Sequence, residues 1–272
     1  MTESAARWDP AQYLRYADER SRPFVELLGR VRASAPAVVV DLGCGPGTLT
    51  ATLAQRWPAA RIIGVDNSAE MIEAAATYAH PAGDEGGSVE FHCADVREFR
   101  PDGSVDVVVA NALLQWVPDH LTMLSDIASW LVPGGELAFQ VPDNFAAPSH
   151  VTVRDLRLSA EWHDRLGAAA DRGAAVATPE EYLTTLAEAG LDADVWTTTY
   201  LHILHGDDPV LEWIKGTALR PVLTALADDP DAAERFLRQC AGKLREAYPP
   251  QPYGTVFPFR RTFAIGQARM SS

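Results

Sequence analysis

The most informative stretch of the chain is Asp41-Leu42-Gly43-Cys44-Gly45-Pro46-Gly47. It follows the apolar run Val38-Val39-Val40 and precedes residues 48–56, where apolar residues recur at helical spacing. Glycine at such a strand-to-helix turn lets a ligand approach the backbone and leaves N–H groups free to bind it. The stretch therefore predicts a ligand-binding loop at the carboxyl end of a buried strand.

The same alternation of strand and helix continues after the loop. We expect a helix over residues 121–131, closed by Pro133-Gly134-Gly135, and strands over residues 62–66, 89–93, 105–110 and 136–141. Alternating strands and helices predict a mainly parallel sheet covered by helices on both faces, the doubly wound α/β class. Two later strands, over residues 195–204 and 254–268, bring the expected sheet to seven strands.

This pattern predicts four parts of the chain. They are an N-terminal helical segment over the site (1–36), a ligand-binding core (37–147), a helical cap interrupted by a core strand near 195–204 (148–253), and a closing strand (254–272). The cap is expected to cover the ligand edge of the sheet.

Four polar residues end four of the apolar strands: Asp41, Asp66, Asp95 and Asn111. Each alone is more often a turn residue, because Asp and Asn commonly begin turns. The carboxyl ends of parallel strands meet at one edge, where ligands of such folds bind. Four of them beside a glycine loop therefore favour a ligand site.

Composition excludes several classes of protein. The 272 residues carry a formal charge of −14, which argues against nucleic acid or an anionic membrane surface as a partner. Three cysteines without C-x-x-C spacing indicate neither a disulfide framework nor a zinc site, and we expect no metal. Without a signal-peptide pattern or an apolar run of roughly 20 residues, a cytoplasmic location is expected. The oligomeric state stays open.

The spacing of the glycines indicates which class of ligand the loop binds. A dinucleotide fingerprint G-x-G-x-x-G starting at Gly43 needs glycine at position 48, which is Thr48. The chain instead has D-x-G-x-G-x-G, and its leading acid, Asp41, would repel a pyrophosphate. Such an acid suits a ligand that carries an ammonium group.

D-x-G-x-G-x-G after the first strand resembles motif I of the class I S-adenosylmethionine-dependent methyltransferases. The resemblance implies a Rossmann-like fold with S-adenosylmethionine as cofactor. It also implies that Asp66 holds the ribose hydroxyls, that Asp95 contacts the adenine amino group and that Met71 packs on the adenine. The implied cofactor-binding residues are Asp41, Gly43, Cys44, Gly45, Asp66, Asn67, Met71, Asp95, Val96 and Asn111.

A closer resemblance covers nearly the whole chain. Segments such as Trp8-Asp9-Pro10, Leu114-Gln115-Trp116, Gln140-Val141-Pro142-Asp143-Asn144 and Leu219-Arg220-Pro221 are similar to those of the trans-aconitate 2-methyltransferase family. The family implies trans-aconitate, a small tricarboxylate, as the substrate. Carboxylates suit Arg forks and nearby donors, so the expected substrate-binding residues are Tyr13, Arg20, Gln115, Trp116, Tyr200 and Arg220. Arg20 is equally suited to the carboxylate of the methyl donor.

The implied reaction needs no catalytic base. A carboxylate with a solution pKa of about 4 is already ionised at pH 7 and attacks the methyl carbon directly. We therefore expect in-line orientation, without a catalytic dyad, to supply the rate. The main alternative is O-methylation of another small carboxylic acid or of a phenol, and a phenol would need a base. Two further alternatives are a nicotinamide-dependent oxidoreductase and a protein that binds S-adenosylmethionine without catalysing a reaction.

Overall fold

The computed structural model describes residues 17–82, 86–167 and 176–270, with side chains from Ser21 onward. These residues divide into two compact units. Unit 1 comprises the described parts of Met1–Val141, Val176–Thr197 and Thr262–Ser272, and unit 2 comprises those of Pro142–Ala175 and Thr198–Arg261. Each unit is described by itself.

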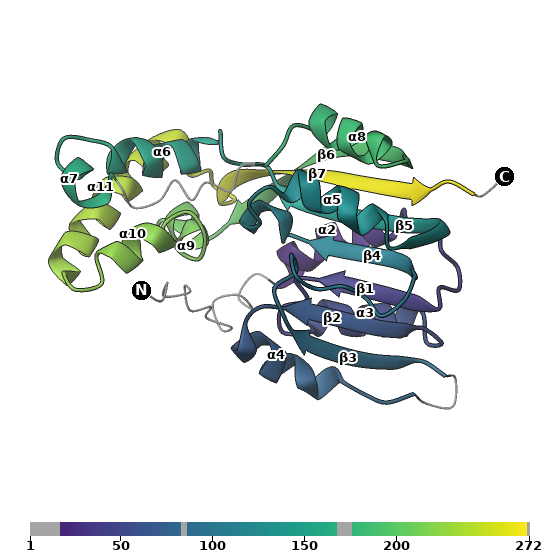
Figure 1. Cartoon of the computed structure of the whole chain (residues 1–272). Coiled ribbons are helices and arrows are strands. Elements are labelled where there is room, and N and C mark those ends of the chain that lie inside the picture. The colour runs from purple at the N-terminus through teal and green to yellow at the C-terminus, as the bar shows by residue number, and fades with distance from the viewer. Residues whose placement is uncertain (1–16, 83–85, 168–175, 271–272) are drawn as a thin grey trace. The chain divides into compact units, whose positions relative to one another are not determined.

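A seven-stranded sheet has the order β3-β2-β1-β4-β5-β7-β6. Its strands are β1 (Val38–Leu42), β2 (Arg61–Asp66), β3 (Ser88–Cys93), β4 (Val105–Asn111), β5 (Leu131–Pro142), β6 (Leu191–Leu204) and β7 (Thr255–Ala268). The first five are parallel, and the end of β7 within unit 1 runs against them (Figure 1). The chain winds outward from β1 to β3 and then resumes at β4 on the other side of β1. This reversal places the expected ligand edge between β1 and β4.

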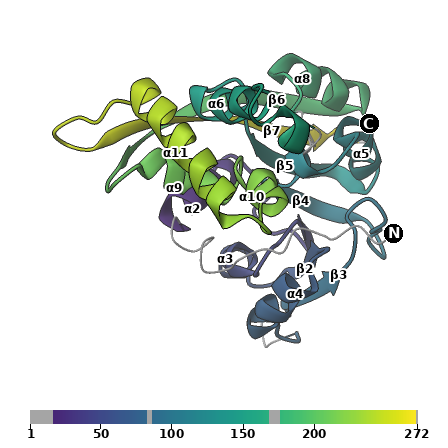
Figure 2. The ribbon, with the colours of Figure 1, turned by 90° about the vertical axis from the view of Figure 1, so that its left-hand side faces the viewer.

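Helices cover both faces of this sheet in unit 1. They are α2 (Ala17–Leu28), α3 (Thr48–Arg56), α4 (Ala69–Ala75), α5 (His120–Ala128) and α8 (Pro179–Glu188), with 3₁₀ turns η1 (Ala76–Tyr78) and η2 (Leu114–Trp116). Figure 2 shows α2 and α3 on the opposite side of the sheet from α5. The predicted doubly wound α/β fold is therefore confirmed.

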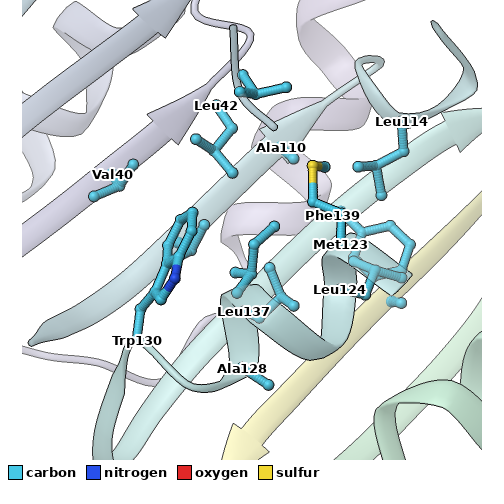
Figure 3. Close-up of a cluster of buried hydrophobic side chains, with 14 of the residues drawn as sticks. Val40, Leu42, Ala110, Leu114, Met123, Leu124, Ala128, Trp130, Leu137 and Phe139 are labelled. Carbon is cyan, nitrogen blue, oxygen red and sulfur yellow. The ribbon is translucent and has the colours of Figure 1, made fainter. Parts of the chain in front are cut away.

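The core of unit 1 follows from strand alternation. Every second strand residue, such as Val40, Leu42 and Phe139, faces α5 and α8 and belongs to one buried apolar cluster (Figure 3). The intervening residues face α3. Asp41 is one of these, so its carboxylate points into a helix-covered face, and the hydroxyl of Thr50 on α3 meets it there.

One predicted boundary is wrong. The helix expected over residues 121–131 ends at Ala128, and Pro133-Gly134-Gly135 lies inside β5 instead of closing a helix. The pairing of β4 with β5 shifts register between Val105 and Val107, and Gly134 has a φ of +81°. This irregularity lets the strand begin before the proline and glycines that the sequence pattern predicts to close the helix.

Unit 2 contains helices and the outer parts of β6 and β7. Its helices are α6 (Pro148–Arg157), α7 (His163–Leu166), α9 (Pro209–Lys215), α10 (Arg220–Ala225) and α11 (Pro230–Ala247). Trp162 and Phe236 pack edge to face at 5.2 Å between ring centroids, and the indole N–H of Trp162 donates to Gln239 Oε1 at 2.7 Å. These contacts attach the connection between α6 and α7 to α11.

Among the described residues, no helix is long and apolar enough to cross a membrane.

Candidate functional site

The loop after β1 is shaped by glycines that serve different purposes. Gly47 has a φ of +77°, and a Cβ there would lie 2.9 Å from Ala75 and 3.0 Å from Phe91, so packing alone excludes a side chain. Gly45 has a φ of +54°, and a Cβ there would meet nothing within 4 Å. The loop therefore closes against α4 and β3 on one side and leaves open space beside Gly45. That open side is where a ligand can approach the backbone.

Asp41 lies at the base of this loop and is only 2% exposed. The Thr50 hydroxyl donates to Asp41 Oδ2 at 2.6 Å. Burial, with a smaller contribution from nearby Asp66, raises the pKa of Asp41 to about 7, although the hydrogen bond from Thr50 opposes the shift. The described groups that set this pKa are therefore the Thr50 hydroxyl and the Asp66 carboxylate, together with burial.

Asp66, at the end of β2, organises the loop from the side. The Gly45 N–H donates to Asp66 Oδ2 at 3.0 Å, and the Ser68 N–H donates to Oδ1 at 2.9 Å. Ser68 then caps α4 by accepting from the Met71 N–H at 3.3 Å. The carboxylate thus joins the end of β2 to the glycine loop and to the start of the next helix.

Asp95, after β3, is held by its neighbour Arg97. The guanidinium forms a bidentate ion pair with the carboxylate, with 2.5 Å between Arg97 Nη2 and Asp95 Oδ2. The backbone N–H of Arg97 also donates to Asp95 Oδ1, at 2.9 Å. This pairing lowers the pKa of Asp95. The adjacent Val96 is buried, as is Met71 on α4, whereas Asn67 is exposed. The acid is ionised and fixed at the edge of the sheet.

Asn111, at the end of β4, lies beside the start of the glycine loop. Asn111 and Leu49 border a cavity of about 30 Å³ together with Phe24, Asp41, Gly43, Cys44, Pro46 and Thr48. A space of that size holds about one water molecule, so it forms the floor of a site and not a whole nucleoside pocket. Strand register explains the convergence, because Leu42 pairs with Ala110 and the next residues, Gly43 and Asn111, follow side by side.

The expected substrate-binding residues are distributed over the chain. Gln115 lies in η2, is 7% exposed and donates from Nε2 to the Ala112 carbonyl at 2.6 Å, and its neighbour Trp116 is half exposed. Tyr200 is buried and Arg220 is partly buried, both in unit 2, where burial lowers the pKa of Arg220. Tyr13 and the side chain of Arg20 lie outside the described residues. The structure brings Gln115 and Trp116 together in one turn, and the other four stay predictions.

Three residues that hold the strand-end groups were missed from the sequence. They are Thr50 beside Asp41, Arg97 beside Asp95, and Gln140, whose Nε2 donates to Asn111 Oδ1 at 2.6 Å. Gln140 is fully buried in β5 between Phe139 and Val141. A polar residue within an apolar strand run was the available signal, because a buried amide needs a partner.

Comparison with known proteins places this geometry in a family. The model of the methyltransferase domain matches residues 39–135. The trans-aconitate 2-methyltransferase of Streptomyces avermitilis is 52% identical over 267 residues, covering 97% of this chain and 98% of the relative. The enzyme of the same name from Streptomyces coelicolor is 51% identical over 269 residues, covering 98% of this chain and 88% of the relative. The chain belongs to the trans-aconitate 2-methyltransferase family.

Membership of the trans-aconitate 2-methyltransferase family makes the chain a methyltransferase that uses S-adenosylmethionine as its cofactor. A solved structure, a putative methyltransferase from Bacillus halodurans, shares the fold at a TM-score of 0.58 and 12% identity, covering 92% of this chain and 100% of the neighbour.

The loop fits this cofactor. S-adenosylmethionine carries an ammonium and a sulfonium, and the loop has two acids beside it, Asp41 and Asp66, that suit these positive charges. The open side of Gly45 leaves room for a ligand to reach the backbone.

Proposed function

We propose that the protein transfers the methyl group of S-adenosylmethionine to one carboxylate of trans-aconitate. The products are a monomethyl ester and S-adenosylhomocysteine. The observation that carries the proposal is the 52% identity, over almost the full length of both chains, to a relative named for this reaction. The D-x-G-x-G-x-G loop and the acids around it support the donor half independently.

The donor side assigns a role to each strand-end acid. Asp41 would face the donor's ammonium, Asp66 the ribose hydroxyls and Asp95 the adenine amino group. Asp66 already uses one lone pair of each oxygen for backbone N–H groups, which leaves the others for hydroxyl donors. At Asp95, the adenine would share the carboxylate with Arg97.

Bound S-adenosylmethionine supplies an electrophilic methyl group on a sulfonium. A carboxylate oxygen of trans-aconitate forms the new C–O bond as the C–S bond breaks toward sulfur, so no proton has to move. Burial raises the pKa of the Cys44 thiol well above its usual range, which keeps it protonated and limits its contribution to the backbone. Alignment of the two reactants then supplies most of the rate, up to roughly 7–11 kcal/mol in well-oriented systems.

The acceptor side needs cations and donors that leave the attacking carboxylate ionised. Arg20 and Arg220, with Tyr13, Gln115, Trp116 and Tyr200, are proposed to hold the substrate. Arg220 is supported by its partly buried position, where a guanidinium forms stronger hydrogen bonds to a carboxylate than it does in water.

We also propose a cytoplasmic location. Cys44, Cys93 and Cys240 are free thiols, which supports a reducing compartment. Burial raises the pKa of Cys240 to about 12, so this thiol is unreactive.

Product analysis tests the reaction directly. Incubation with methyl-labelled donor and trans-aconitate should give a methyl ester that alkali hydrolyses. With saturating donor, so that titration of Asp41 does not limit donor binding, the rate should be flat above pH 6 because trans-aconitate is already ionised. Activity only on a phenol, with a rate that rises toward pH 10, would overturn the proposal. Binding of the donor without any transfer would indicate a silent binding protein.

Substitution of Arg220 tests the substrate side. Arg220→Ala should raise the KM for trans-aconitate about 10- to 100-fold, because a hydrogen bond to a charged group contributes roughly 1.5–3 kcal/mol. The KM for the donor should stay unchanged. Arg238→Ala is the matched control, since Arg238 is 69% exposed on α11 and pairs with Glu234. If Arg220→Ala raised only the donor's KM, the substrate role of Arg220 would be wrong.

A further inference from the structure

Gln140 holds two consecutive residues at the point where β4 ends. Its side-chain Nε2 donates to Asn111 Oδ1 at 2.6 Å, and its backbone carbonyl accepts from the Ala112 N–H at 2.9 Å. Gln140 is fully buried and is the register partner of Asn111 on β5. A residue of the neighbouring strand thus fixes both the side chain and the backbone at the end of β4.

The backbone held in this way is strained. Ala112 has a φ of +54°. The other non-glycine residues with positive φ in the described part of the chain are Asp119 and Asp208, a residue type that tolerates this conformation. Alanine has no polar side chain that could stabilise this conformation, so hydrogen bonds from other residues must hold it. The Gln140 carbonyl accepts from the Ala112 N–H, and Gln115 Nε2 donates to the Ala112 carbonyl at 2.6 Å. Strain maintained from two sides at a strand end indicates that this geometry is needed for function.

The contact with Gln140 decides which end of the Asn111 amide faces the ligand edge. The acceptor oxygen, Oδ1, is turned toward β5. The amide nitrogen, Nδ2, has no acceptor among the described residues, and Asn111 borders the same cavity as Asp41 and Gly43. The end of β4 therefore offers two N–H donors to whatever binds beside the glycine loop.

The two reactants of the proposed function differ in what they can do with these donors. The reacting end of S-adenosylmethionine is a sulfonium cation, which offers no hydrogen-bond acceptor to an N–H group. The reacting end of trans-aconitate is a carboxylate, whose second oxygen can accept while the first attacks. We propose that Gln140 is a positioning residue that keeps the Asn111 Nδ2 group directed at the reacting carboxylate of trans-aconitate. This inference rests on the proposed function.

Two substitutions that preserve shape test it. Asn111→Asp keeps the acceptor for Gln140 and replaces the free N–H groups with a charged oxygen. Gln140→Glu offers an acceptor to Asn111, which turns the amide around and presents its oxygen to the substrate. Trans-aconitate binding to the enzyme–S-adenosylhomocysteine complex, measured by calorimetry, should weaken about 10- to 100-fold in both variants. The affinity for S-adenosylhomocysteine alone should fall less than the affinity for trans-aconitate, because this inference assigns the Asn111 amide, which the family resemblance counts among the cofactor-binding residues, to the acceptor.

Further variants separate positioning from packing. Gln140→Met removes the hydrogen bond without reversing the amide, so it should weaken trans-aconitate binding less than Gln140→Glu. Gln267→Glu is the matched control: Gln267 lies in β7 of the same sheet and donates to the Gly134 carbonyl at 3.1 Å. Asn111→Asp keeps the test valid if a buried glutamate at position 140 prevents folding.

The outcomes are distinguishable. If the unaltered enzyme neither binds nor methylates trans-aconitate, the proposed function fails. If the unaltered enzyme does both and the Asn111 and Gln140 variants bind trans-aconitate equally well, the inference about Gln140 is wrong while the proposed function stands. A loss confined to S-adenosylhomocysteine affinity would assign the amide to the donor and would also overturn the inference.

Discussion

The strand-end acids Asp41 and Asp66 of unit 1 obtain their partners in a different way from two buried polar groups of unit 2. In unit 1 the strand-end acids bind groups that are close in sequence: Asp41 is 9 residues from Thr50, and Asp66 is 21 residues from Gly45. In unit 2 the partners are distant. Asn144 Oδ1 accepts from the Arg260 N–H across 116 residues, and the Tyr248 hydroxyl accepts from the Ser149 N–H across 99.

This difference has a physical consequence for each half. Local partners keep the loop geometry of unit 1 dependent on a few short segments. Distant partners make the contacts of Asn144 and Ser149 in unit 2 dependent on segments from both ends of that unit. Each unit also contains an ionisable group whose pKa is strongly shifted by burial, the acid Asp41 in unit 1 and the base His150 in unit 2.

The largest effect is expected from Asp41. Its folded pKa of about 7 lies above its usual value of 3.8, so the folded state holds the proton more tightly and stability falls as pH rises from about 4 to 7. The side chain in Asp41→Asn cannot titrate. As pH rises over that interval, the free energy of unfolding of this variant should therefore increase by up to roughly 4 kcal/mol relative to that of the parent. Denaturant unfolding at pH 4.5, 6 and 7.5 measures it. Equal pH dependence in both proteins would show that Asp41 is not a buried acid.

His150 in unit 2 should give the opposite slope. Burial lowers its pKa from 6.5 to about 4, so the unfolded state binds the proton more tightly and stability falls as pH drops through this range. The free energy of unfolding of His150→Gln should therefore exceed that of the parent by roughly 3 kcal/mol near pH 4 and equal it above pH 7. Hydrogen exchange that reports the amides of α6 measures this change within unit 2. A variant that gains stability at high pH instead would reverse the assigned sign.

These opposite slopes bear on what could be predicted from sequence. Strand alternation and the D-x-G-x-G-x-G loop predicted the seven-stranded α/β fold and the convergence of Asp41, Gly43 and Asn111, because their placement depends on local order and on parallel pairing. The sequence did not reveal the charge state of Asp41, since that depends on burial under α3. It did not reveal the role of Gln140 either, because an amide in a strand shows its partner only after the strands are paired.

Unit 2 was less predictable for the same reason. The sequence predicts a helical cap over residues 148–253, and the structure divides the part of it that lies in unit 2 into the shorter helices α6, α7, α9, α10 and α11. The buried polar residue Ser149 finds its partner on a segment 99 residues away, for which no spacing rule exists. The helix boundary missed at Ala128 has a related cause, because β5 begins early through its pairing with β4.

A direct test of the donor loop is Asp66→Ala. It removes the acceptor of the Gly45 and Ser68 N–H groups and, in the proposed function, the ribose ligand. The affinity for S-adenosylhomocysteine should fall about 100-fold, the effect of losing two hydrogen bonds to a charged group. Asp102→Ala is the control, because Asp102 is 68% exposed and pairs with Arg61 on the surface of the same unit. Equal affinities in the two variants would remove Asp66 from the donor site.

The smallest effects are expected at two helix caps, one in each unit. The Thr178 hydroxyl accepts from the Glu181 N–H at the start of α8 in unit 1, and Asp229 Oδ1 accepts from the Ala232 N–H at the start of α11 in unit 2. In both caps the acceptor and the donor are three residues apart in sequence, so we expect each cap to stabilise its helix by a similar amount in either unit. Thr178→Ala and Asp229→Ala should each cost about 1 kcal/mol in the free energy of unfolding. Asp229→Asn, which keeps the cap and weakens the ion pair with Arg165, isolates the capping part of the second value. Equal costs would mean that this local interaction stabilises both units alike. A cost in unit 2 several times larger would show that even its helix starts depend on distant packing.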